Sequence, residues 1–276
     1  MLRIVEGSDT QGLLDLLARR PASIELDRAA LEIARIEFPQ LDADDAIARI
    51  DRHAWAIAER ARDLSDGCSF IETANAYLFR EAGFRGNNDD YYRPDNSCLN
   101  RVLETRLGIP ISLSVVYIEV ARRLAKPVHG VGLPGHFLIR YDDSDYSAII
   151  DPFHGGAILN EEQCAKLARV DTLDPALLEP VDMRYIAMRM INNLRSVYFA
   201  RRDHGKALAI LDLLIAADPD SGDEHKQRAV ALLHQHRISE AINEFKRFLD
   251  LCPQAPDRER VEEQIRNLAF WRASCN

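Results

Sequence analysis

The sequence of 276 residues predicts an α+β domain followed by an α-helical repeat region. Three observations predict this order: helical periodicity through residues 1–85, short extended runs between residues 128 and 150, and a repeat of 34 residues after residue 188. A chain of this length can bury one large core and still carry a smaller appendage. We therefore expect residues 1–180 to form the first domain and residues 181–276 the second.

Composition and charge argue against several classes of protein. Acidic residues outnumber basic ones by 44 to 35, whereas nucleic-acid binding requires a basic face. The longest stretches without a charged residue, 107–118 and 127–139, are too short to cross a bilayer as a helix. The five cysteines form no CxxC pair, so we expect no disulfide framework, no metal site and no cofactor. The sequence thus predicts a cytoplasmic protein without a nucleic-acid or membrane partner and leaves the oligomeric state open.

Helices dominate the first third of the chain. Apolar residues recur at helical spacing over 26–37 and 45–64, and a further helical run begins at Ser69 and ends at Gly83. Residues 83–96 are rich in Gly, Asn, Asp and Pro, which is typical of a loop. Two adjacent tyrosines within this segment favour an ordered loop.

The period of the apolar residues then changes from helical to extended. A short helix over 98–107, capped by Asn96 or Ser97, precedes Pro110, which begins a helix whose apolar residues form one stripe. After this helix the sequence predicts short strands at 128–131, 137–141 and 147–150.

The last two of these strands flank a polar segment, 142–145, and should form an antiparallel hairpin. If the turn is centred on this segment, paired residues have position numbers that add up to 287, which pairs His136 with Asp151. A carboxylate in this place can orient an imidazole and fix its tautomer, as in a catalytic triad. The alternative is a histidine at a strand end that simply satisfies the nearest carboxylate.

A triad also needs a nucleophile, and Ser112 is the candidate. It lies at the start of the helix that begins at Pro110, where the free N–H groups of a helix N-terminus can stabilise an oxyanion. Serine is also a favoured helix-capping residue, and that role alone would explain its presence.

The C-terminal region repeats with a period of 34 residues. Similar residues recur at this spacing in the pairs Ala207 and Ala241, Leu211 and Phe245, Leu214 and Phe248, and Pro219 and Pro253. This period is typical of tetratricopeptide repeats, with an unrelated helical bundle as the alternative. We expect two helical pairs with turns at 202–205 and 236–239, followed by a last helix at 258–274. Two repeats bury little surface, so they should also pack against the first domain.

Three segments resemble one protein family. They are YLFREAGFRGNNDDYYRPDNSCLNRVLETRLGIPISLSVVYIEVARRL, GVGLPGHFLIRY and IIDPFHGG. On these motifs, the chain is identified as a member of the SirB-type transglutaminase-like proteins over about residues 70–165, the segment that would form the cleft. The resemblance implies a papain-like, transglutaminase-like fold with a Cys-His-Asp triad. His136 and Asp151 match the last two triad positions, and Ser112 stands where the cysteine would be.

The serine leads to two hypotheses. A thiol ionises readily beside an imidazole, whereas a hydroxyl must lose its proton during attack, so a site suited to a thiolate would work poorly with serine. The first hypothesis is a non-catalytic protein that binds a protein or peptide through the cleft and the repeats. The second is a serine-dependent amide or ester hydrolase, or an acyltransferase, that uses Ser112, His136 and Asp151.

Overall fold

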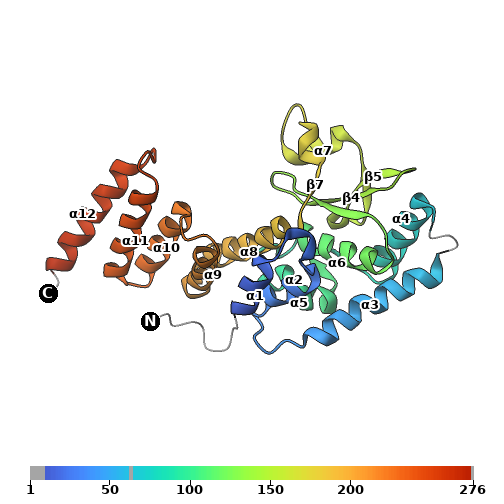
Figure 1. Cartoon of the computed structure of the whole chain (residues 1–276), viewed down its shortest axis with the longest axis horizontal. Coiled ribbons are helices and arrows are strands. Elements are labelled where there is room, and N and C mark those ends of the chain that lie inside the picture. Colours follow the sequence, from blue (N-terminus) through green and yellow to red (C-terminus); the bar gives the residue numbers. More distant parts are fainter. Residues whose placement is uncertain (1–9, 62–64, 275–276) are drawn as a thin grey trace. The chain divides into compact units, whose positions relative to one another are not determined.

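The structure, a computed structural model, describes residues 10–61 and 65–274 and divides into two compact units (Figure 1). One unit is Arg19–Asn193. The other combines helix α1 (Thr10–Ala18) with the chain from Leu194 onward. The division falls inside helix α8 (Met183–Ala200). The domain boundary at residue 180 stays a prediction.

The first unit confirms the expected α+β fold. Its main sheet is antiparallel, with the strand order β6-β5-β4-β3-β7. These strands are β3 (Val128–Val131), β4 (Leu138–Asp142), β5 (Ser147–Asp151), β6 (Ala157–Leu159) and β7 (Pro180–Val181). A short parallel pair joins β1 (Arg85–Gly86) to β2 (Leu107–Gly108). The α-helices of this unit are α2 (Leu26–Ala34), α3 (Ala43–Arg60), α4 (Gly67–Asn75), α5 (Leu99–Thr105), α6 (Pro110–Arg123) and α7 (Glu161–Ala168).

Helix α6 lies at the centre of this unit. It contacts strands β3 and β4 on one side and helices α2, α3 and α5 on the other (Figure 1). Every residue from Pro110 to Ala121 is buried, including two serines and Glu119. The expectation of a single apolar stripe was therefore wrong, because a helix covered on all sides has no face that needs to be polar.

The hairpin of β4 and β5 exists, but its register differs from the predicted one. Ile139 pairs with Ile150, so paired position numbers add up to 289 rather than 287. The centre of the turn therefore lies one position later than predicted, and each residue pairs with a partner two positions further on. Asp143 closes this turn, because its carboxylate accepts hydrogen bonds from the backbone N–H groups of Asp145 and Tyr146. A shift of this size keeps each side chain on its predicted face, since the side-chain period of a strand is two.

The helices before the sheet begin near their predicted starts, but their ends differ. Helix α3 ends at Arg60, and residues 62–64 of its predicted span lie outside the described residues. The run predicted to end at Gly83 continues after α4 as a π-helix (Ala76–Glu81). Gly83 has the positive φ of 80° that its role after a helix end requires. The helix predicted at 98–107 is shorter: Cys98 precedes it without a side-chain cap, Asn96 lies in a 3₁₀ turn (Pro94–Ser97), and Arg106 ends it in a left-handed conformation. Because the helix ends before Arg106, the next two residues form strand β2, which the periodicity of the sequence did not predict.

The second unit confirms the helical repeats. Its helices after α8 are α9 (His204–Ala217), α10 (Gly222–His234), α11 (Ile238–Leu251) and α12 (Arg258–Ser274). Both predicted turns are present, and each contains a residue with positive φ, Arg202 at 59° and His236 at 57°. Ala207 and Ala241, which occupy equivalent positions, are fully buried. The packing of this unit on the first stays a prediction.

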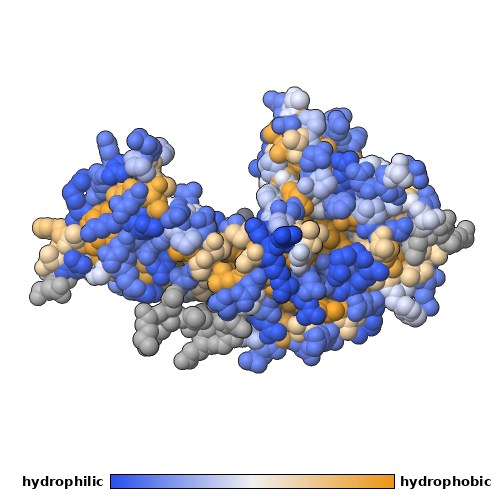
Figure 2. Space-filling view, in the orientation of Figure 1, coloured by the Kyte–Doolittle hydropathy of each residue, from blue (hydrophilic) through white to orange (hydrophobic). Residues whose placement is uncertain are grey.

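The surface of the repeat unit carries some apolar side chains. Figure 2 shows hydrophobic surface over the region of α10 to α12, and on α12 the side chains of Phe270 and Trp271 are exposed. None of the helices that the structure describes combines the length and the apolar character that a membrane span requires.

Candidate functional site

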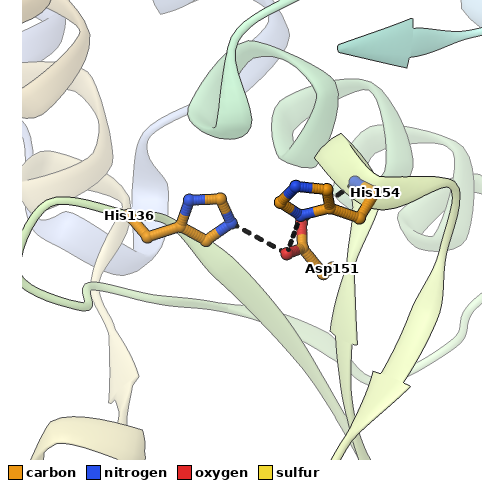
Figure 3. A group of neighbouring side chains, drawn as sticks. All are labelled: His136, Asp151 and His154. Atoms are coloured by element: carbon orange, nitrogen blue, oxygen red, sulfur yellow. Dashed lines mark hydrogen bonds and ion pairs between the residues drawn. The ribbon is translucent and has the colours of Figure 1, made fainter. Parts of the chain in front are cut away.

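His136 and Asp151 lie at one end of the main sheet. His136 precedes strand β4, and Asp151 is the last residue of β5. The Nε2 atom of His136 lies 2.9 Å from Oδ2 of Asp151, which is a hydrogen-bond distance (Figure 3). Because Asp151 occupies Nε2, the other ring nitrogen, Nδ1, is the one through which His136 could contact a further group.

Asp151 is almost fully buried and uses both carboxylate oxygens. Oδ1 accepts hydrogen bonds from the backbone N–H groups of Phe153 and His154. Oδ2 is shared by His136 and by Nδ1 of His154, at 2.7 Å from the latter. Burial acts to raise the pKa of Asp151, but the hydrogen bonds from the two histidines outweigh burial and lower that pKa. The site therefore holds an ionised carboxylate between two imidazoles.

The segment before β4 is held in place by Arg189 on helix α8. Its guanidinium donates to the carbonyl oxygens of Leu133, at 2.8 Å, and His136, at 2.7 Å. Two glycines permit the tight path of this segment: Gly135 has a φ of 72°, and a Cβ on Gly132 would lie 2.8 Å from the ring of Tyr185. Arg189 thus fixes the backbone that carries the imidazole.

Ser112 has a different environment from the one that a nucleophile needs. Its side chain is completely buried, and its Oγ donates to the carbonyl oxygen of Asn96 at 2.6 Å while accepting from the N–H of Ile109 at 3.0 Å. Among the described residues, its hydrogen-bond partners are backbone groups and not His136. Ser112 therefore anchors the loop before α5 to the start of α6.

This role makes a stability prediction for Ser112→Ala. We expect the free energy of unfolding to fall by about 2 kcal/mol, because two buried backbone groups lose their hydrogen-bond partner. Ser114→Ala is the matched control: Ser114 is equally buried on the same helix, but its Oγ only donates to Pro110 within the helix. We expect a loss below about 1 kcal/mol there. Urea denaturation of both variants tests this, and equal losses would contradict the anchoring role.

A pocket of about 120 Å³ lies beside His136. Its lining comes from the loop before α5, the N-terminus of α6, the turn before β4 and helix α8: Tyr91, Ile109, Pro110, Ile111, Gly135, His136, Phe137, Arg189 and Asn193. Ile111, one position before Ser112, lines this pocket together with His136. The structure thus brings His136 to Asp151 and Ile111, whereas the side chain of Ser112 points to the loop.

Sequence reasoning missed several of these residues. His154 is one of them, although its spacing of three from Asp151 at the end of a strand could have indicated a contact. The predicted ordered loop is held by Asn96, whose amide donates to the carbonyl oxygens of Asp90 and Tyr91. No sequence signal marked Arg189, because it lies far along the chain from His136.

Comparison with known proteins assigns the two parts of the chain to two families. Residues 44–192 match the transglutaminase-like superfamily, and residues 194–266 match a tetratricopeptide repeat family. The chain is 35% identical to a UPF0162 protein of Xylella fastidiosa over 90% of this chain and 91% of that protein. It is 30% identical to a UPF0162 protein of Pseudomonas aeruginosa, over 94% and 96% of the two chains.

A further similarity involves a longer protein. The chain is 34% identical to F-box only protein 21 of Mus musculus, with 54% of this chain aligned to 26% of that protein. The two family matches meet between residues 192 and 194, where the structure divides into its two units.

The fold and the His–Asp pair define a transglutaminase-like domain joined to tetratricopeptide repeats. The chain belongs to the transglutaminase-like superfamily and, within it, to the UPF0162 proteins, which confirms the SirB-type resemblance.

Proposed function

We propose that this chain is a non-catalytic binding protein whose pocket beside His136 receives a side chain of a protein or peptide partner. The observation that supports the proposal is the difference between two neighbouring residues at the start of α6. Ile111, which has no nucleophilic atom, lines the pocket together with His136. The hydroxyl of Ser112 instead donates a hydrogen bond to the carbonyl oxygen of Asn96. Such a site retains an oriented imidazole without a nucleophile beside it.

The size of the pocket supports a side chain as its occupant. Sites for drug-sized ligands usually enclose about 300–1,000 Å³, and this pocket has about 120 Å³. His136 and Arg189 contribute polar groups to its lining. We therefore expect a partner side chain that ends in a hydrogen-bond acceptor.

The repeats support a protein partner. Helical repeats stack into extended surfaces that bind other proteins, and the family match covers residues 194–266. We propose that these helices supply a second contact surface for the same partner. Cys68, Cys164 and Cys252 carry free thiols, which fits a reducing compartment, so we place this binding in the cytoplasm.

The second candidate function is a serine-dependent amide or ester hydrolase or acyltransferase with Ser112, His136 and Asp151. The intact hydrogen bond between His136 and the ionised Asp151 favours it. For Ser112 to attack a substrate, its Oγ must first leave the buried carbonyl of Asn96, which then loses a hydrogen bond. This cost makes the binding function the better supported one.

The experiment for the binding function uses the full-length protein and a random heptapeptide phage library. We expect selected peptides to bind the wild type and Ser112→Ala with equal affinity in fluorescence anisotropy, because Ser112 does not line the pocket. Asn193→Trp should reduce affinity at least about 10-fold, a loss of 1.4 kcal/mol or more, by filling the pocket from α8. Arg184→Trp, at an exposed position on the same helix, is the control.

The outcomes separate the two functions. Peptides that bind Asn193→Trp as well as the wild type would contradict the pocket as the binding site. Hydrolysis of p-nitrophenyl acetate by the wild type, abolished in both Ser112→Ala and His136→Ala, would favour the hydrolase instead.

A further inference from the structure

We propose that His136, Asp151 and His154 bind a divalent transition-metal ion, with Zn²⁺ the best match to their ligand atoms. This inference goes beyond the binding function and does not depend on it. The three donor atoms, one from each residue, all lie within 4.8 Å of one another (Figure 3). Two imidazoles and a carboxylate are a ligand set that Zn²⁺ takes in proteins.

Two of the distances between these atoms are slightly shorter than those of a coordination sphere. Oδ2 of Asp151 lies 2.9 Å from Nε2 of His136 and 2.7 Å from Nδ1 of His154. With bonds of about 2.0–2.1 Å, ligand atoms around a tetrahedral Zn²⁺ are roughly 3.3 Å apart. An opening of roughly half an ångström at Oδ2 would admit the ion. The two imidazole nitrogens, which lie within 4.8 Å of each other, would come to the same separation. The imidazoles would then carry their protons on His136 Nδ1 and His154 Nε2, with no net proton loss if both are neutral.

The carboxylate is already oriented for this role. Two backbone N–H groups, of Phe153 and His154, hold Oδ1. Oδ2 is thereby directed at the two imidazoles, as supporting hydrogen bonds direct ligand atoms in metal sites. A His–Asp pair that only orients one imidazole does not require a second imidazole on the same oxygen. A metal ion bound at Oδ2 would use both imidazoles as ligands.

The surroundings provide access for an ion. The side chain of His154 is 54% exposed, whereas those of His136 and Asp151 are 10% and 1% exposed. The site is thus buried on two sides and open to solvent at His154, which leaves room for a water molecule as a further ligand. Structural zinc sites are closed by protein ligands, so this geometry resembles a site that keeps a position for an exchangeable ligand.

The test is a Zn²⁺ titration of the full-length, metal-depleted protein by isothermal titration calorimetry. We expect one ion per chain, with a Kd of about 1 μM or tighter, and Co²⁺ should give the visible absorption of a four-coordinate ion. His154→Gln should weaken Zn²⁺ binding more than about 100-fold, because it removes a ligand of the ion. Loss of a residue that only supports a ligand already costs about 10–100-fold. His154 is the exposed member of the set, and circular dichroism verifies that this variant folds.

The control is another pair of histidines. His204 and His234 stack with ring centroids 4.1 Å apart in the repeat unit, and His204→Gln should leave Zn²⁺ affinity unchanged. Lack of saturable binding at one ion per chain, or equal affinity of His154→Gln and the wild type, would overturn the metal site. His154 does not line the pocket, so His154→Gln should still bind the selected heptapeptides. Failure of the metal site is therefore distinguishable from failure of the binding function.

Discussion

Ile111→Cys will carry a thiol that iodoacetamide alkylates at neutral pH at least about 100-fold faster than the thiol of Ser112→Cys. The pocket places position 111 beside His136 and at the N-terminus of α6. A nearby imidazolium and a helix N-terminus both lower a thiol pKa, so a larger fraction of the thiol is ionised and reactive. Both positions are buried, but Ile111 lines the pocket, whereas the side chain of Ser112 points toward the Asn96 carbonyl.

The rates are measured by mass spectrometry of the alkylated peptides, which separates each new cysteine from the five native ones. Adding His136→Ala to Ile111→Cys should remove most of the gain, because the imidazole then no longer stabilises the thiolate. Faster alkylation at position 112 than at 111 would show that the serine occupies the nucleophile position after all. Labelling of the wild type by a serine-reactive phosphonate would lead to the same conclusion.

The sequence was sufficient to predict the His–Asp contact, although the register on which it was based was wrong. The error was two positions, and a shift of two keeps side chains on the same face of a strand. The prediction failed at the turn, where the side chain of Asp143 organises a turn over residues 143–146, one position later than the predicted 142–145. The contact survives because His136 precedes β4 and reaches Asp151 from a turn rather than from a ladder position.

The sequence could not decide which residue at the start of α6 faces His136. Neighbouring residues on a helix point about 100° apart, so an error of one position changes a pocket residue into one that faces the loop. The alignment of the motif GIPISLS with the family places Ser112 at the nucleophile position, one position after Ile111. The phase of the helix depends on contacts with β3, β4 and α5, which are distant in sequence. The same tertiary contacts bury all faces of α6, and the buried Glu119 is accommodated there by its contacts with Arg122 and Arg123.

Asp27→Ala will lower the free energy of unfolding of the first unit by about 3 kcal/mol. Asp27, on α2, is buried, and its Oδ2 accepts hydrogen bonds from Arg123 at 2.8 Å and Arg122 at 3.2 Å, both at the end of α6. Glu119 accepts from the same two arginines. Removing one partner of a buried ion pair typically costs about 3–5 kcal/mol. The lower end applies because Arg123 keeps its contact with Glu119.

Asp51→Ala is the matched control for this prediction. Asp51, on α3, also pairs with Arg123, but its side chain is 58% exposed. Exposed ion pairs contribute about 0–1 kcal/mol, so we expect a loss below about 1 kcal/mol. Urea titrations followed by Trp55 fluorescence, in a Trp271→Phe background, report the first unit alone because these are the two tryptophans of the chain. Equal losses in the two variants would show that burial does not distinguish these pairs.

The dependence of this effect on pH gives a second, independent measurement. Burial acts to raise the pKa of Asp27, but the hydrogen bonds from Arg123 and from the backbone of Arg28 outweigh burial, so its pKa lies below the ordinary value of 3.8. A carboxyl group with a lowered pKa stabilises the folded state above its unfolded pKa and loses this contribution as the pH falls through its folded pKa. The difference in stability between the wild type and Asp27→Ala should thus be constant above about pH 5 and shrink below pH 3.8. A difference that stays the same down to pH 3 would mean that Asp27 stabilises the fold through packing rather than through its charge.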